Sequence, residues 1–265
     1  MKKNTIFMCL SLGLAGLLSS CSSFDNPYEP KEVASEKGLL TLNLASGVEF
    51  TTRAANESDW TNLENYNITI KKEGGEAVTK PYSEWGFPWA CDEGTYSVTA
   101  FKGEEKAYSH DTFYATGNGS CTVEKGKESK AEITVSPTAG KVIVEYDPEL
   151  STYCSDYSID FSGTTAMGSE IAHTDKANNE GPWYFALKKG GETVNYTINL
   201  TAKSDYTKEG SATGSFVLEP NQVKKLTIKA NHDEYTQGGI IISITIDKET
   251  DEKPVDVEVP VTWVN

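Results

Sequence analysis

The chain has 265 residues and carries 39 acidic against 24 basic side chains, which gives a formal net charge of −15. Because there is no basic stripe to meet phosphates, this charge excludes nucleic acid as a partner and favours a solvated surface. The hydrophobic content of 37% suffices for a buried core, and the length allows one or two domains.

The N-terminal segment resembles a lipoprotein signal peptide. Lys2 and Lys3 precede an apolar run over residues 6–18, which is shorter than the roughly 20 residues that span a bilayer. The run ends in LSSC, which resembles the bacterial lipobox and predicts cleavage before Cys21, with lipid on its thiol. The alternative is an ordinary signal peptide with an incidental cysteine.

We therefore expect a signal peptide over 1–20, a membrane anchor through lipid at Cys21, and a polar tether over 21–37. Ser22 stands where an aspartate retains many Gram-negative lipoproteins at the inner membrane. The expected location is the outer membrane, lipid-anchored at the cell surface.

Alternation of apolar and polar residues runs through most of the chain and predicts half-buried β-strands. The alternating segments are 40–44, 66–70, 96–100, 133–135, 142–146, 157–161, 194–200, 226–228, 240–246 and 255–263. The pattern shows no convincing amphipathic helix. The predicted fold class is all-β.

Weak internal sequence similarity at a spacing of about 95 residues predicts that the chain arose by duplication. The matched segments, which occur in the same order, are 66–70 with 157–161, 95–100 with 195–202, and 122–135 with 217–230. We therefore expect two tandem transthyretin-like or immunoglobulin-like β-sandwiches over 38–137 and 138–265, with a hinge at 136–140. A shared β-rich composition is the alternative source of this similarity.

The residue types that usually carry catalysis form no recognised motif. His110, His173 and His232 lie far apart without ligand spacing, so surface or loop histidines are a better interpretation than a metal site. The sequence lacks a nucleophile elbow, a zinc-protease motif and a nucleotide-binding fingerprint. We expect no enzyme, no cofactor and no metal. Because glycosidase carboxylates need no local motif, an accessory domain of a hydrolase system is kept as a third hypothesis.

One stretch, PYSEWGFPWA, gathers the aromatic residues Tyr82, Trp85, Phe87 and Trp89 around Glu84. Flat aromatic faces stack on sugar rings and a carboxylate accepts hydroxyl hydrogen bonds, so these residues form a candidate ligand-binding site. Core packing is the favoured alternative, because large aromatic residues are usually buried. Trp85, Phe87 and Trp89 also share a period of two, which predicts one face of a strand.

Three cysteines remain after Cys9 leaves with the signal peptide and Cys21 takes lipid, namely Cys91, Cys121 and Cys154. Cys91 and Cys121 could pair and leave Cys154 free. Three buried thiols are the slightly preferred alternative.

Several segments together resemble a Bacteroidales family of lipoproteins of unknown function that is related to the fimbrillin-like proteins. They are the lipobox, GLLTLNL, the following TRA, DEGTYSVTA, GSCTVEKGK and GKVIVEYDPEL. The resemblance covers most of residues 38–230. It implies two transthyretin-like sandwiches and a non-enzymatic surface protein that acts as a pilus subunit, an anchor or an adhesin.

Arg53 is the only arginine of the chain and follows the first predicted strand. In fimbrillins of this type, an arginine-specific protease cuts after the first strand, and the vacated groove takes a terminal strand of the next subunit. The resemblance therefore implies processing between Arg53 and Ala54, and like subunits as partners by strand exchange. An ordinary surface residue in a lysine-rich chain is the alternative.

The C-terminal segment 255–263 alternates strictly, and Pro254 and Pro260 cannot donate ladder hydrogen bonds, which suits an edge strand. Such a strand could be donated to a neighbour or could close its own domain. The second hypothesis for the function is a surface glycan-binding lipoprotein that uses the aromatic stretch, with a glycan or a host protein as its partner.

Overall fold

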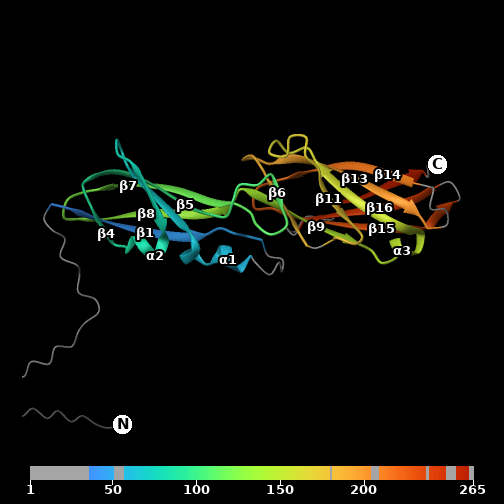
Figure 1. Ribbon diagram of the computed structural model, residues 1–265, viewed down its shortest axis with the longest axis horizontal. Coiled ribbons are helices and arrows are strands. Elements are labelled where there is room, and N and C mark those ends of the chain that lie inside the picture. Colours follow the sequence, from blue (N-terminus) through green and yellow to red (C-terminus); the bar gives the residue numbers. More distant parts are fainter. Residues whose placement is uncertain are drawn as a thin grey trace, which may run out of the picture. The chain divides into compact units, whose positions relative to one another are not determined.

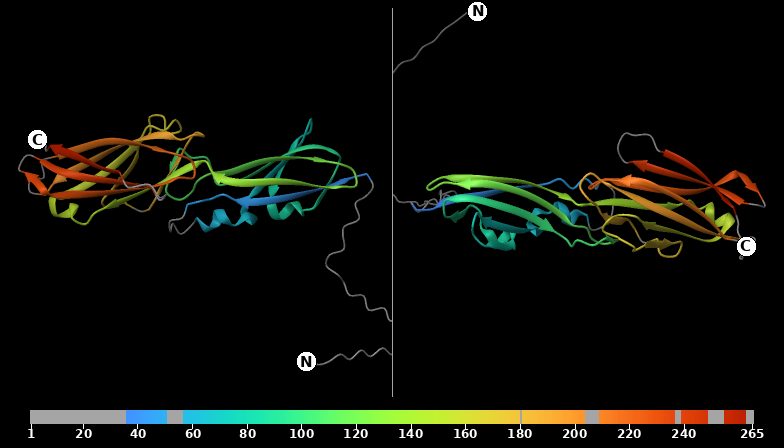
Figure 2. Two further views of the ribbon diagram at one scale, coloured as in Figure 1. Left: turned by 180° about the vertical axis from the view of Figure 1, so that it is seen from behind. Right: turned by 90° about the horizontal axis from the view of Figure 1, so that it is seen from above.

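The computed structural model describes residues 36–50, 57–179, 181–203, 209–236, 239–248 and 255–262, with side chains up to residue 230. The predicted signal peptide over 1–20 and most of the predicted tether lie outside these ranges. Figure 1 shows two groups of strands, one coloured blue to green and one coloured yellow to red, and both appear again in the views of Figure 2.

Strands dominate the described residues, so the predicted all-β, sandwich-like class is confirmed. The strands of the N-terminal half are β1 (Gly38–Ser46), β2 (Asn67–Lys72), β3 (Ala77–Pro81), β4 (Trp89–Cys91), β5 (Gly94–Lys102), β6 (Tyr108–Ser109), β7 (Ala115–Val123) and β8 (Glu128–Pro137). Alternation explains them: Tyr96, Val98 and Ala100 of β5 are buried, whereas Thr95 and Ser97 are exposed.

The C-terminal half continues the same pattern. Its strands are β9 (Ala139–Tyr146), β10 (Cys154–Ser162), β11 (Ala172–Asp175), β12 (Trp183–Ala186), β13 (Glu192–Ala202), β14 (Glu209–Leu218), β15 (Val223–Thr236), β16 (Gly239–Lys248) and β17 (Val255–Thr262). The described helices are α1 (Ser58–Thr61), the 3-10 helix η1 (Leu63–Asn65), α2 (Tyr82–Trp85) and α3 (Leu150–Tyr153). These described segments have only three or four residues each, far fewer than a helix needs to span a membrane.

The strand order of the N-terminal half recurs in the C-terminal half. The sheet order β3-β2-β5-β7 matches β11-β10-β13-β14, and the order β8-β1-β4 matches β15-β9-β12. In each half the first strand pairs in parallel with the last strand of the repeat, β1 with β8 and β9 with β15. This correspondence agrees with the duplication that the internal sequence similarity predicts. The domain boundaries at 38–137 and 138–265 stay a prediction.

Two hydrophobic cores accompany the two halves. Residues of the first core include Leu40, Ile68 and Val98, and residues of the second include Ile159 and Leu226. Contacts that link the halves include the pairing of β6 with β12 and the packing of Tyr184 of β12 in the first core.

Cys91, Cys121 and Cys154 are free thiols, which agrees with the preferred alternative, although Cys121 is only half-buried. Burial raises the pKa of Cys154 to about 11, so this thiol is protonated near neutral pH. At the other end of the chain, β17 is an edge strand that pairs with β16, and Pro260 lies opposite Ile241. The edge position expected from the prolines is confirmed.

Candidate functional site

The first strand lies inside its sheet and not at its margin. β1 pairs in parallel with β8 over residues 39–46, and on its other side it pairs with β4 over residues 38–40. Leu40 and Leu42 are buried in the first core, and Leu44 packs against it. Among the described residues, β4 pairs with β1 alone, so β1 holds β4 in the sheet.

The residues that follow β1 are bound by the C-terminal half. Asn221, in the turn between β14 and β15, accepts a hydrogen bond on Oδ1 from the Glu49 backbone N–H at 3.0 Å. Its Nδ2 donates to the Gly47 carbonyl oxygen at 2.7 Å. Asn221 has a φ of 63°, the left-handed region that asparagine tolerates better than most residues. The Asn221 side chain thus forms hydrogen bonds with the backbone on both sides of residue 48.

Phe50 anchors the end of this tail in an aromatic cluster. Its ring is 7% exposed and lies 5.0 Å from the Phe113 ring, edge to face, and 5.7 Å from the Tyr184 ring. The Lys141 Nζ atom lies 6.0 Å from the centre of the Phe50 ring. Such edge-to-face and cation–π contacts add to the burial of the ring.

A buried ion pair anchors the chain again at residue 57. Lys141 Nζ lies 2.6 Å from Glu57 Oε1, and the Lys141 side chain is 1% exposed. The Tyr184 hydroxyl donates to the same carboxylate oxygen at 2.8 Å. Burial, and then the neighbouring carboxylate, raise the pKa of Tyr184, so its hydroxyl remains a donor. Phe50 and Glu57 therefore both contact Tyr184.

The predicted processing and lipidation residues lie outside the described residues. These are Cys21, Arg53 and Ala54. The structure describes the flanking positions Phe50 and Glu57, which are both buried. Processing at Arg53 and lipidation at Cys21 stay predictions.

The aromatic stretch does not form the single strand face that its period of two predicts. Tyr82 and Trp85 lie in the one-turn helix α2, which ends at Gly86 with a φ of 61°, and Trp89 lies in β4. A residue with a Cβ is strained in this left-handed region, so Gly86 permits the abrupt turn. The prediction of one strand was wrong, because the helix and turn bring the rings together from two elements.

The rings of this stretch pack on one another and on the first core. Trp85 is 6% exposed, its Nε1 donates to the Ile68 carbonyl oxygen at 3.1 Å, and its ring lies 5.1 Å from Trp89. Tyr82, Phe87 and Trp89 are half-buried, and Glu84 is exposed. Trp85 is therefore a core residue, as the favoured alternative expected. Ligand binding by Tyr82, Glu84, Trp85 and Trp89 stays a prediction.

Trp85→Phe is expected to lower the free energy of unfolding by about 1–3 kcal/mol, because the hydrogen bond from the Trp85 indole to the Ile68 carbonyl oxygen is lost and the ring loses volume. Urea unfolding measures this change. Trp89→Phe is the matched control, with a smaller expected effect because Trp89 is half-buried. Equal effects of both substitutions would contradict the assignment of Trp85 as the core ring.

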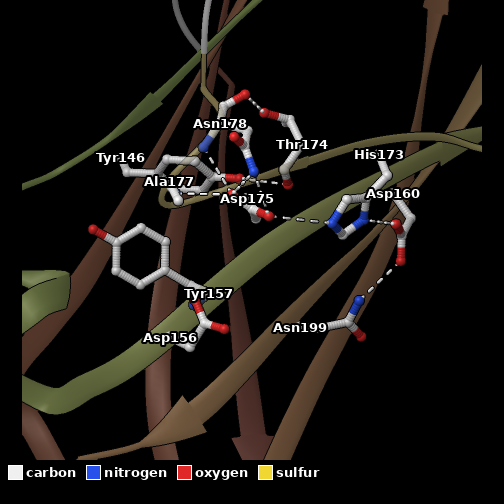
Figure 3. Close-up of polar contacts among 10 residues, drawn as sticks. All are labelled: Tyr146, Asp156, Tyr157, Asp160, His173, Thr174, Asp175, Ala177, Asn178 and Asn199. Atoms are coloured by element: carbon white, nitrogen blue, oxygen red, sulfur yellow. Dashed lines mark hydrogen bonds and ion pairs between the residues drawn. The ribbon is translucent and has the colours of Figure 1, made fainter.

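A polar cluster that the sequence analysis missed lies on β10, β11 and β13 (Figure 3). His173 Nδ1 lies 2.6 Å from Asp160 Oδ1, and its Nε2 lies 3.8 Å from Asp175 Oδ2. Asn199 Nδ2 donates to the other Asp160 oxygen at 2.9 Å. Asp160 and His173 are direct partners in the antiparallel register, which sequence spacing alone cannot reveal.

This cluster behaves as a hydrogen-bonded surface patch. Hydrogen bonds from Asn178 and Ala177 hold the pKa of Asp175 below its usual range, with the backbone N–H of Asn178 as the largest cause. The His173 side chain is 53% exposed, as expected for a surface histidine. Among the residues that the structure describes, no group of His, Cys, Asp and Glu is arranged to hold a metal ion.

The described residues form open cavities that include one on the C-terminal half and one where this half meets the N-terminal half. One, of about 350 Å³, is lined by polar residues of β10, β13 and β14, including Asp156, Asn199 and Glu209. The other, of about 490 Å³, is lined by residues that include Ala107 and Leu187. Neither brings together the residues predicted as sites from the sequence.

Comparison with protein families matches residues 36–261 to the family described as "Domain of unknown function (DUF4493)". No curated protein matches the chain.

Solved structures from Bacteroidales are similar to the chain at low identity. A protein of Bacteroides eggerthii described as a candidate cell adhesion protein has 13% identity and a TM-score of 0.44, with 88% of this chain and 96% of that chain covered. The fimbrial anchor protein Mfa2 of Porphyromonas gingivalis has 10% identity and a TM-score of 0.42, with 83% and 99% covered. A Bacteroides thetaiotaomicron structure described as candidate polysaccharide-binding proteins (DUF1812) has 8% identity and a TM-score of 0.40, with 81% and 99% covered.

Proposed function

The chain belongs to the family of the domain of unknown function DUF4493, and from this premise we propose that it is a non-enzymatic, fimbrillin-like protein of the cell surface. In this proposal it acts as a pilus subunit, an anchor or an adhesin. The observation that supports the proposal is the position of β1. This strand is the first of the fold, lies between β8 and β4, and is followed by the segment that contains the only arginine.

A strand in this position is suited to exchange. Leu40 is fully buried and Leu42 is 4% exposed, and each such side chain is worth about 1.5–3 kcal/mol of burial free energy. Loss of β1 opens a groove between β8 and β4 and leaves the edge of β8 unpaired over residues 128–135. An unpaired strand edge is a template for another extended segment. A strand of a second copy fits this groove by the same main-chain hydrogen bonds.

The start of the mature chain on cells tests which role applies. Intact mass and N-terminal sequencing are the measurements. A chain that begins at a lipid-modified Cys21 supports a permanent anchor, whereas a chain that begins at Ala54 supports a processed subunit. A chain that begins at neither residue contradicts the proposal in both forms.

The proposed anchor gives a prediction at Cys21. Cys21→Ala is expected to abolish lipid attachment, so that the protein is recovered as a soluble or unprocessed form, because stable anchoring requires the acyl chains. Membrane fractionation with metabolic fatty-acid labelling is the measurement. Cys9→Ala is the matched control and should leave anchoring intact. Full membrane retention of unlabelled Cys21→Ala protein would rule out the lipid anchor.

The second candidate is a glycan-binding surface protein, which the aromatic stretch favours. Tyr82, Phe87 and Trp89 keep part of their ring surface exposed, next to the exposed carboxylate of Glu84. Partly exposed rings can stack on sugars. A glycan array that compares the unaltered chain with Trp89→Ala tests this candidate, and equal signals from both proteins would exclude the stretch.

A further inference from the structure

The tail that follows β1, residues 47–50, makes contacts in addition to the hydrogen-bond ladder of β1. The ladder joins β1 to β8 and β4, all within the N-terminal half. The Gly47 N–H extends this ladder, because it donates to the Val135 carbonyl oxygen of β8 at 2.7 Å. The Gly47 carbonyl, the Glu49 N–H and the Phe50 ring are instead contacted by Asn221 and Tyr184 of the C-terminal half, together with Phe113. Residues more than 170 positions apart are thereby joined, since Gly47 and Asn221 are 174 positions apart.

The positions of Asn221, Phe113 and Tyr184 define which peptide segment can bind here. Asn221 offers one donor and one acceptor, spaced to meet a carbonyl oxygen and an N–H that lie two residues apart. Phe113 and Tyr184 contact an aromatic ring one residue further along the chain. The site therefore fits a peptide segment that carries an aromatic residue three positions after the carbonyl that Asn221 binds. The two hydrogen bonds of the half-buried Asn221 fix the register, and the contacts with the buried Phe50 ring add affinity.

We propose that Asn221, Phe113 and Tyr184 form a receptor site for such a peptide, and that this tail site retains β1 after the following loop has been cut. The second part rests on the proposed function, in which the chain is processed at Arg53. Phe50 precedes the cut, so the tail contacts stay with the detached segment. Glu57 follows the cut and stays paired with Lys141, so the remaining chain keeps its own anchor.

Retention by the tail site makes cleavage and release two separate events. A cut chain holds its first strand through the β8 ladder and, independently, through the C-terminal half. A replacing strand must then displace both sets of contacts. The tail site thus sets how long a cut subunit retains its β1 strand.

Hydrogen exchange of the uncut, full chain tests the receptor site without any protease. Asn221→Gly removes both side-chain hydrogen bonds, and glycine tolerates the φ of 63°. The amides of residues 39–50 are expected to exchange about ten-fold faster, because two hydrogen bonds of ordinary strength are lost. Asn221→Asp keeps the acceptor for the Glu49 N–H but loses the donor to Gly47. Its exchange rates should therefore lie between those of the unaltered chain and those of Asn221→Gly. Asn199→Ala, which removes a hydrogen bond elsewhere in the C-terminal half, is the control.

Cutting the purified chain at its only arginine with an arginine-specific protease tests retention. The N-terminal segment is expected to co-elute with the remainder on gel filtration and to dissociate about ten-fold faster in Asn221→Gly. Equal dissociation rates, or unchanged exchange in the uncut variant, would overturn the receptor site. If the protease does not cut the loop, the hydrogen-exchange measurement on the uncut chain decides whether the receptor site exists. Neither readout depends on oligomers, so a failure of strand exchange between subunits leaves this test intact.

Discussion

Lys141→Met is expected to lower the free energy of unfolding by about 3–5 kcal/mol, because it leaves the carboxylate of Glu57 buried without its cation. Lys141 is 1% exposed, and its Nζ lies 2.6 Å from Glu57 Oε1. After the substitution, the Tyr184 hydroxyl is the remaining donor that the structure shows for this oxygen. Urea unfolding at pH 7, followed by intrinsic fluorescence, measures the loss.

Two further variants separate burial from charge pairing. The double variant Glu57→Leu with Lys141→Met removes both charges and is expected to lie within about 1 kcal/mol of the unaltered chain, or above it. Lys127→Met breaks an exposed pair with Glu124 and should cost less than about 1 kcal/mol. A cost for Lys141→Met as small as that for Lys127→Met would show that water reaches the pair.

The strands that the sequence predicted are those with one buried face. β5, β10 and β13 alternate strictly because a half-buried strand needs apolar residues at every second position. β12 was missed because Trp183, Tyr184 and Phe185 are all buried, so its two faces cannot be told apart by alternation.

β7 was missed for a different reason, which lies in its glycines. Gly117 and Gly119 suggest turns in a sequence, yet both lie within this strand. A Cβ on Gly117 would collide with the Thr134 carbonyl oxygen of β8, so the close approach of two strands explains the glycine. This approach depends on β7 and β8 being neighbours in the folded sheet, which no local pattern encodes.

The contacts around the tail could not be read from the sequence either. Asn221 lies in the polar turn that the sequence predicts between two strands, but its hydrogen-bond partners are 172 and 174 positions away. Glu57 and Lys141 are 84 positions apart in a chain that is rich in both residue types. Only the folded backbone distinguishes them from solvated charges. In the aromatic stretch, by contrast, the general burial of large aromatic residues led to the expectation of core packing, which describes Trp85.

Cleavage between Arg53 and Ala54 is expected to convert the monomer into higher oligomers once the N-terminal segment has dissociated. The departure of β1 removes Leu40, Leu42 and Leu44 from the first core, and each side chain contributes about 1.5–3 kcal/mol when fully buried. This loss favours capture of a strand from a second copy. Gel filtration with light scattering, before and after treatment with an arginine-specific protease, is the measurement.

Variants at the cleavage position make this test specific. Arg53→Lys keeps the positive charge but should resist the protease, so neither the cut nor the oligomers are expected. Asn221→Gly should be cut at the same rate and should form oligomers sooner, because the tail site no longer delays release of β1. If the cut chain stays monomeric after its first segment has left, strand exchange is contradicted. Arg53 is then an ordinary surface residue of a tethered protein, and the anchor or adhesin form of the proposal is the one to pursue.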